Sequence, residues 1–307
     1  GIILYTSRNQ ANLSPCIQDV SVDDLIEMDK NYLQRITLRR RIMKEHPETV
    51  LAAEKCVKSS TDDFYVWLVG AYLPTRSPRM FTLTQEEKEK PSSIHNLVTN
   101  ETFSLCPADN PLDTLRILSG LVEDDLLFLL PSDDGGGYML KGFVSCFPNG
   151  FNTATKFNLE LRDIHTPIPQ YREKLEKSMD RYFEKLKAGK FIQRANWTIT
   201  TTDHLFTVSG THLPMRPLSH LRYNFITLLS LARVRCERQS LHRLPQSRAI
   251  LFSFKTYLYS LPEIKDEGFG EILAQAIDGL KEGNAPAFLF YKRAVVSGGS
   301  AKAYLRS

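Results

Sequence analysis

The spacing of hydrophobic residues changes along the chain, and the change separates a helical N-terminal part from a strand-rich remainder. After Ser21, which suits an N-cap, the apolar residues recur at helical spacing. They are Leu25, Met28, Leu33, Ile36 and Ile42. Further helices are expected at about 48–58 and 61–72. Residues 1–75 are therefore predicted to form a helical region that packs on the rest of the molecule.

Short apolar runs separated by turn residues follow, as is typical of antiparallel hairpins. One hairpin is expected to turn at Asn100 and Glu101, and another joins DLLFLLP to YMLKGFV through an Asp-Asp-Gly-Gly-Gly turn. Later elements are a helix after Pro169 that Gly189 closes, a strand FIQRANWTIT, two strands joined around 244–247, and a helix over 262–281. Helices first and antiparallel strands later predict an α+β fold. Residues 76–290 would form this domain, and 291–307 a flexible tail.

Composition and charge narrow the class of partner. The chain has 39 basic and 35 acidic residues and a formal net charge of +4, too balanced for nucleic acid, whose phosphates need a concentrated basic face. No stretch approaches the roughly 20 apolar residues of a membrane span. The five cysteines are scattered without a CxxC pair, so we expect no zinc or iron–sulfur site and an intracellular, cytoplasmic location. Because the sequence starts at Gly1, an upstream targeting or anchor segment would not be visible in it.

The stretch 233–241 carries charge on both faces of its predicted strand. One face would hold Arg233, Arg235, Glu237 and Gln239, and the other Val234, Cys236, Arg238 and Ser240. Arginine on both faces indicates that the strand lines a pocket or meets an anion. Pairing of these arginines with Glu237 and other acids explains the pattern equally well.

A second concentration of functional groups is the tetrapeptide RANW. Arg194, Asn196 and Trp197 bring a cation, an amide and an indole together. Such a set could hold a flat ligand with carboxylates, because arginine pairs with carboxylates and an indole stacks on flat rings. A core tryptophan beside a solvent-facing arginine is the commoner arrangement.

Among the seven histidines, His165 lies in the proline-rich elbow RDIHTPIPQY. The sequence contains no HExxH, GxSxG, Walker or GxGxxG motif. A haem protein can use a single histidine, because the porphyrin supplies four of the iron's ligands. His165 is therefore a candidate metal ligand, and a hydrogen-bonded histidine that closes a turn is the alternative.

Taken in order, IHTPIPQY, RANW and RVRCERQSLHRLPQSRAILFSFKTYLYSL resemble the catalytic α-subunit of haem-dependent oxidative N-demethylase and its relatives. IEMDKNYLQRITLRRRIMKEHPETV and GFVSCFPNGFNTATKF resemble that family too, so the similarity runs from about 18 to 282. It implies a PAS-like antiparallel sheet with flanking helices that holds a b-type haem within 76–290. It also implies O2 activation at the haem and oxidation of an amine N-methyl group, with release of formaldehyde.

The resemblance further implies separate partners. In relatives, electrons come from NADPH through FMN and iron–sulfur components on other polypeptides. This sequence has no dinucleotide motif or cysteine cluster, so a separate reductase is expected beside O2 and a small-molecule substrate. A haem enzyme on the same scaffold with a larger substrate and a non-catalytic haem or PAS sensor remain alternatives.

Carried over residue by residue, the resemblance makes His165 the candidate proximal iron ligand, with His242, His220 or a Cys236 thiolate as alternatives. Glu237 is a candidate for holding a cationic amine or relaying protons. Gln239 would complete the catalytic pocket. The remaining candidates would contact the haem propionates or line the pocket wall, and they are Arg194, Asn196, Trp197, Arg235, Arg238 and Arg243.

Overall fold

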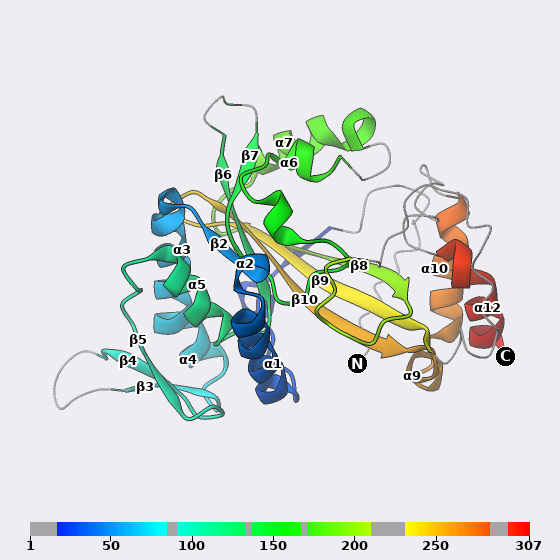
Figure 1. Cartoon of the computed structure of the whole chain (residues 1–307), viewed down its shortest axis with the longest axis horizontal. Helices are drawn as coiled ribbons and strands as arrows, with labels where there is room; N and C mark the ends of the chain where they lie inside the picture. Colours follow the sequence, from blue (N-terminus) through cyan, green and yellow to red (C-terminus); the bar gives the residue numbers. More distant parts are fainter. Residues whose placement is uncertain are drawn as a thin grey trace.

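The frame of the molecule is a seven-stranded antiparallel sheet in the order β1-β8-β9-β10-β6-β7-β2 (Figure 1). A computed structural model describes residues 17–84, 91–132, 135, 137–166, 171–209, 231–282 and 294–307. The strands, in sheet order, are Gln18–Val20, Phe191–Thr200, Arg233–Arg243, Ile250–Ser260, Asp125–Pro131, Tyr138–Val144 and Leu51–Ala53. With helices at both ends of this sheet, the predicted α+β class is confirmed.

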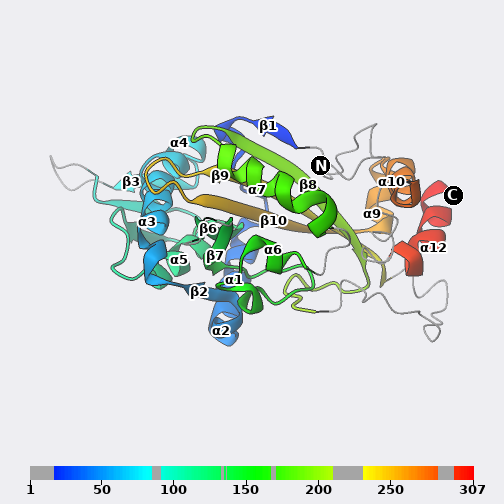
Figure 2. The ribbon, with the colours of Figure 1, turned by 90° about the horizontal axis from the view of Figure 1, so that it is seen from above.

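The three long strands β8, β9 and β10 form the centre of the sheet. Seen from above, they run from the N-terminal helices at one end to the C-terminal helices at the other (Figure 2). Asn196 of β8 and Thr256 of β10 both lie opposite Glu237 of β9. Every residue of β9 after Arg233 is buried, so β9 is covered on both of its faces.

The N-terminal third packs against one end of this sheet. Its helices are α1 (Tyr32–Glu45), α2 (Pro47–Val50), α3 (Lys58–Trp67), α4 (Leu73–Arg76) and α5 (Pro111–Ser119). A π-helical turn, Leu68–Tyr72, joins α3 to α4. A small sheet of β3 (Phe81–Thr84), β4 (Ser93–Asn96) and β5 (Glu101–Ser104) lies beside them. These helices share one hydrophobic core with β6, in which Phe64 and Leu118 are buried with Phe128.

The first helix is shorter than the apolar pattern predicts. Ser21 caps only a 3-10 turn, Val22–Asp24, and α1 begins at Tyr32. Between them, the Tyr72 hydroxyl accepts from the Ile26 amide and donates to the Ile26 carbonyl, at 3.0 and 3.1 Å. Tertiary partners therefore satisfy backbone groups that would otherwise favour continuing the helix.

Two other predicted helices differ from the structure. The segment 48–58 contains strand β2, whose Leu51 pairs with Val144 of β7, so a distant strand overrides the local helical pattern. The helix expected over 262–281 is divided into α9 (Leu261–Asp266) and α10 (Gly270–Glu282). The chain turns between them at Gly268, whose φ of +81° favours glycine.

The end of the chain was predicted to be a flexible tail, and for Ala294–Arg306 this is wrong because these residues form helix α12. Ala301 and Leu305 are buried in a cluster with residues of α9 and α10. Lys302 and Arg306 pair with acids of α10, Asp278 and Glu271. The prediction failed because few residues of α12 are strongly apolar, and those few are enough to pack it.

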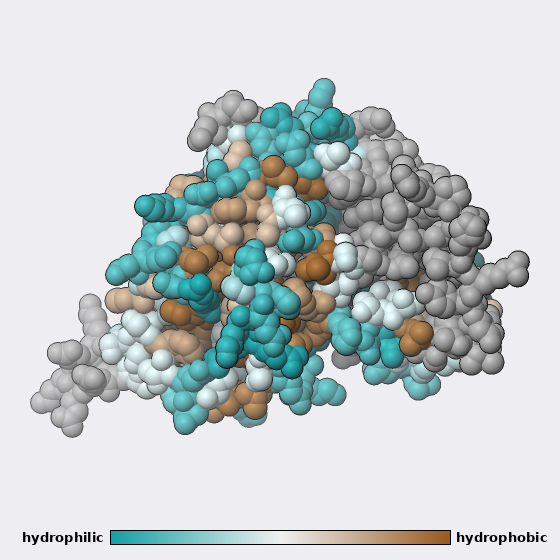
Figure 3. Space-filling view, viewed as in Figure 1, coloured by the Kyte–Doolittle hydropathy of each residue, from teal (hydrophilic) through white to brown (hydrophobic). Residues whose placement is uncertain are grey.

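Exposed apolar side chains come from separate parts of the described chain, including Leu33, Val66, Leu97 and Leu231. On the visible face, hydrophobic and hydrophilic residues are interspersed over the N-terminal helices (Figure 3). Such scattered residues are normal at protein surfaces. In the described part of the chain, no helix combines the length and the apolar character that crossing a membrane would require.

Candidate functional site

The central strands present two chemically different faces, because in-register residues of antiparallel neighbours point to the same side. One face, here called the α7 face, carries Arg194, Asn196, Glu237 and Gln239. Helices α6 (Leu161–Ile164) and α7 (Glu176–Lys185) pack on this face. The opposite face, here called the α10 face, packs on α9, α10 and α12. The face on which a side chain lies therefore decides which neighbours it can meet.

A chain of polar contacts crosses the α7 face. Arg194 Nε donates to Gln239 Oε1 at 2.6 Å, and Gln239 Nε2 donates to Glu237 Oε2 at 2.7 Å. Asn196 Nδ2 donates to the same Glu237 oxygen at 3.1 Å. The other oxygen of Glu237, Oε1, is buried and has no hydrogen-bond partner among the described residues. The site therefore offers a positioned carboxylate with one acceptor unused.

His165, directly after α6, has one ring nitrogen fixed and the other available. Its Nδ1 lies 2.7 Å from the Leu161 carbonyl oxygen, which can only accept, so Nδ1 carries the proton. Its ring stacks on Tyr171 with centroids 4.7 Å apart. Burial lowers the pKa of His165 to about 4. At neutral pH the imidazole is therefore uncharged, with its lone pair on Nε2.

Two cations, Lys156 and Arg194, lie near this imidazole. Their positive charges lower the pKa of His165 further, because they disfavour a second positive charge on the ring. Burial also lowers the pKa of Arg194 itself, and the charge of Glu237 acts against that shift. The fold thus brings His165, from the elbow, to the same side of the sheet as Arg194 of β8. The α7 face combines a neutral imidazole, desolvated cations and a buried carboxylate.

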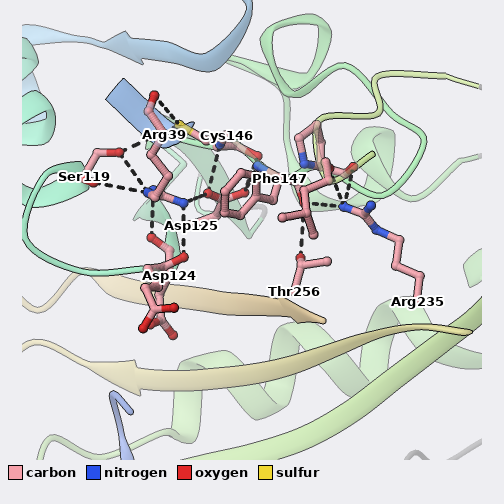
Figure 4. A network of polar contacts seen from close by, with 12 residues as sticks. Arg39, Ser119, Asp124, Asp125, Cys146, Phe147, Arg235 and Thr256 are labelled. Atoms are coloured by element: carbon pink, nitrogen blue, oxygen red, sulfur yellow. Dashed lines mark hydrogen bonds and ion pairs between the residues drawn. The ribbon is translucent and has the colours of Figure 1, made fainter. Parts of the chain in front are cut away.

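Arg235 lies on the α7 face but is used to hold loops. Its NH2 group donates to the carbonyls of Phe147, Pro148 and Leu205 at 2.8, 2.9 and 2.8 Å. Figure 4 shows this guanidinium directed at the Phe147 segment, to which Thr256 also donates at 3.2 Å. Burial lowers the pKa of Arg235 to about 10. Its role is to fix the two loops that cover this part of the face.

Two predicted pocket residues lie on the opposite side of the sheet from Arg194 and Glu237. Trp197 and Arg238 fall on the α10 face, because alternation along a strand separates them from Arg194 and Glu237. Trp197 packs against the cluster formed with the C-terminal helices. Arg238 donates to the Asp24 carbonyl at 2.9 Å. Neither can line a pocket on the α7 face.

Arg243 has the correct parity for the α7 face, but its donors are already engaged. It donates to the carbonyls of Leu186, Arg248 and Phe183 at 2.7, 2.6 and 2.5 Å. It also donates to the Tyr138 hydroxyl at 2.8 Å. Arg243 therefore ties the end of α7 to the β9–β10 turn, and the prediction that it binds a ligand finds no support in this geometry.

Two of the alternative iron ligands, Cys236 and His242, lie on the other face of the sheet from Arg194 and Glu237. Cys236 is buried on the α10 face in the cluster with Val234 and Leu261. His242 lies on the same face, with its ring 5.4 Å from that of Phe191 and 6.3 Å from that of Phe64. His220, like Pro167 and Pro169 of the elbow, lies outside the described residues. Within the described chain, His165 is the candidate that shares a face with Arg194 and Glu237.

The burial of His242 predicts a dependence of stability on pH. Burial lowers its pKa from 6.5 to about 4, so the unfolded state binds this proton more readily. The corresponding stability is present above pH 6.5 and is lost as the pH falls towards 4. Between pH 7.5 and pH 5 this amounts to about 2 kcal/mol.

Urea unfolding of the wild type and of His242→Phe at both pH values measures this contribution of His242 to the free energy of unfolding. The variant keeps an aromatic ring beside Phe64 and Phe191, and its stability should fall less on acidification by about 2 kcal/mol. The acid sensitivity of other groups cancels in the comparison. Equal losses in the two proteins would contradict a neutral, buried His242.

Two residues of the site had not been predicted. Lys156 belongs to GFVSCFPNGFNTATKF, and Tyr171 closes the elbow motif IHTPIPQY. Both stretches carry the family resemblance, but nothing in their local pattern assigns either side chain to the site. Helix or strand periodicity does not predict that Lys156 lies near the imidazole of His165, because the conformation of the loop between them brings the two together.

A comparison with protein families places the whole chain in a known family. A family model described as haem-dependent oxidative N-demethylase, alpha subunit-like, matches residues 16–302. The match covers nearly the whole chain, including the elbow, β8, β9 and β10. The family is named after the alpha subunit of a haem-dependent oxidoreductase. The chain therefore belongs to the haem-dependent oxidative N-demethylase alpha subunit-like family.

Proposed function

We propose that this protein is the haem-binding subunit of an oxidative N-demethylase-like monooxygenase, with His165 as the protein ligand to the iron of a b-type haem. The family supports the class of cofactor and reaction. Within the chain, the observation that carries the proposal is the imidazole of His165, which has its Nδ1 bonded to a carbonyl and its Nε2 without a partner among the described residues.

The donor set on the α7 face fits a haem. One histidine nitrogen is enough to hold a haem iron to a protein, and the hydrogen bond from Nδ1 to a carbonyl fixes the ring and raises its basicity. A neutral histidine does not have to lose a proton before it binds metal. Arg194, near the same ring, is suited to pairing with a carboxylate at the porphyrin edge.

Glu237 would bind the nitrogen of a cationic amine. Asn196 and Gln239 occupy its Oε2, which leaves the buried Oε1 to accept an N–H of the substrate. A buried carboxylate with an unused acceptor favours a cation, because the pair compensates for desolvation of both charges. The bound haem would supply the oxidation of the N-methyl group with O2 and electrons. The chain orients the amine and excludes water around it.

The remaining parts of the proposal concern architecture and partners. The antiparallel sheet with helices on both faces is compatible with a PAS-like fold. The electrons would come from a separate reductase that carries NADPH, FMN and iron–sulfur chemistry. Assembly with another subunit accords with the family description as an alpha subunit.

Absorption spectra of the protein reconstituted with haem test the proposal first. We expect a Soret band that shifts on reduction with dithionite and again with CO. With a surrogate reductase and O2, a secondary or tertiary methylamine should then yield formaldehyde. Lack of a Soret band would overturn the haem assignment, and stable O2 binding without turnover of methylamines would favour a sensor.

Replacement of Glu237 with glutamine is expected to leave haem binding intact and to impair oxidation of cationic amines. The glutamine can keep its carbonyl towards Asn196 and Gln239, which turns its NH2 group towards the substrate. We expect kcat/KM to fall by about 10- to 100-fold, the usual effect of losing a charged hydrogen bond. Formaldehyde release as a function of amine concentration measures it.

A neutral substrate provides the control for this variant. Oxidation of an N-methylamide, if the site accepts one, should change little in Glu237→Gln because no ammonium is present. Glu271→Gln on α10 removes a carboxylate that pairs with Arg306 away from the site and should leave kcat/KM unchanged. An equal loss with charged and neutral substrates would assign Glu237 a structural role.

A further inference from the structure

Lys156 is a cation that the fold holds in place, and the described part of the chain supplies it with no counter-charge. It ends the 3-10 turn Thr153–Lys156, whose N-cap Asn152 accepts from the Ala154 amide at 3.0 Å. The next residue, Phe157, packs edge-on against Phe143 of β7 with ring centroids 6.0 Å apart. The backbone that carries Lys156 is therefore fixed on both sides.

The ammonium of Lys156 has weak partners. Its Nζ donates to the Ile164 carbonyl at 3.4 Å and lies 4.6 Å from the centre of the Phe151 ring. No carboxylate of the described chain lies within ion-pair distance of it. Burial lowers the pKa of Lys156, as expected for a desolvated ammonium that lacks an anion. Such a group is costly unless an anion approaches it.

The ammonium of Lys156 lies beside the segment that carries His165. The Ile164 carbonyl that it contacts immediately precedes His165, and its charge acts on the imidazole together with that of Arg194. Of these two cations, Arg194 has Glu237 as a counter-charge. Positive charge therefore exceeds negative charge beside an available imidazole. This arrangement suits a ligand whose metal binds a nitrogen and whose edge is anionic.

We propose that Lys156 forms an ion pair with a propionate carboxylate of the haem that His165 coordinates. This inference rests on the proposed function, since it presupposes that a haem binds on the α7 face. It adds a binding residue that neither the sequence motifs nor the family match had indicated. The chemistry required of the ligand is a carboxylate close to the coordinated metal.

Titration of the apo-protein with haemin and with haemin dimethyl ester tests the pair. Esterification removes the propionate charges and keeps the iron. For the wild type we expect the ester to bind at least about tenfold more weakly than haemin. Lys156→Gln should weaken binding of haemin by about tenfold and binding of the ester much less.

Two further variants separate charge from structure. Lys156→Arg keeps the cation and should restore most of the affinity for haemin. Lys185→Gln removes an exposed lysine at the end of α7 and should leave both affinities unchanged. If Lys156→Gln weakens binding of haemin and of the ester equally, or weakens neither, the ion pair is refuted and the haem assignment stands. If the wild type binds neither porphyrin, the haem assignment fails and the ion pair falls with it.

Discussion

Replacement of His165 with glycine is expected to weaken haem binding by more than about 100-fold, because the iron loses its only proposed protein ligand. The imidazole is already neutral, with burial lowering its pKa to about 4, so protons should compete with iron only in acid. The measurement is the Soret absorbance after reconstitution at pH 7, followed by reduction and addition of CO.

Free imidazole distinguishes ligation from folding in this variant. Added imidazole should enter the space left by the side chain and restore the ligated spectrum if His165 coordinates the iron. His204→Ala removes a histidine whose side chain is 81% exposed, and it should bind haem like the wild type. An unchanged spectrum in His165→Gly without imidazole would refute the assignment.

Replacement of Arg39 with methionine is expected to reduce the free energy of unfolding by about 3–5 kcal/mol, as for removal of one partner of a buried ion pair. Arg39 of α1 is fully buried. It contacts Asp125 at 2.5 Å and donates to the carbonyls of Ser119, Glu123 and Asp124 (Figure 4). Methionine fills much of the volume but leaves these acceptors buried without the donor. Equilibrium unfolding in urea measures the loss.

The adjacent arginine provides a matched control. Arg40 pairs with Glu101 where both side chains are more than a third exposed, so Arg40→Met should cost less than about 1 kcal/mol. The two variants lose the same charge and gain the same side chain at neighbouring positions of one helix. Equal costs would show that the hydrogen bonds of Arg39 do not stabilise the fold as the geometry indicates.

The Arg39 network also links the helical region to the site. Asp125 accepts from the Phe147 amide at 2.8 Å, and Arg235 donates to the Phe147 carbonyl at 2.8 Å. One residue is thus held from the N-terminal core on one side and from β9 on the other. The helical region fixes a loop over the α7 face in addition to stabilising the domain.

The sequence predicted those elements whose signals are local. β6 and β7 pair as a hairpin, and β9 and β10 pair on either side of the turn around residues 244–247. Each of these strands is a run of apolar or alternating residues that ends at a turn. Its partner strand is the run that follows the turn. In β2, by contrast, three residues pair with a strand about 90 positions further on, and no nearby residue signals that contact.

The site was predictable in part for a similar reason. Alternation along β9 groups Glu237 with Gln239, and the structure places Arg194 and Asn196 beside them. The same alternation along β8 separates Trp197 from Asn196, so the grouping of RANW as one ligand-binding unit neglected the period of the strand. Arg243 has the right parity, and only the position of α7 shows that its donors are engaged. Lys156 depends on how a loop folds.

The burial of β9 on both faces restricts how its length can change during evolution. Insertion of one residue near Cys236 would turn every later side chain to the other face, so Glu237 would enter the apolar cluster of α10. Insertion of two residues would keep the faces but move Glu237 away from Asn196. Related chains should therefore vary in length at the turn between Arg243 and Ile250, and hardly ever within the strand itself.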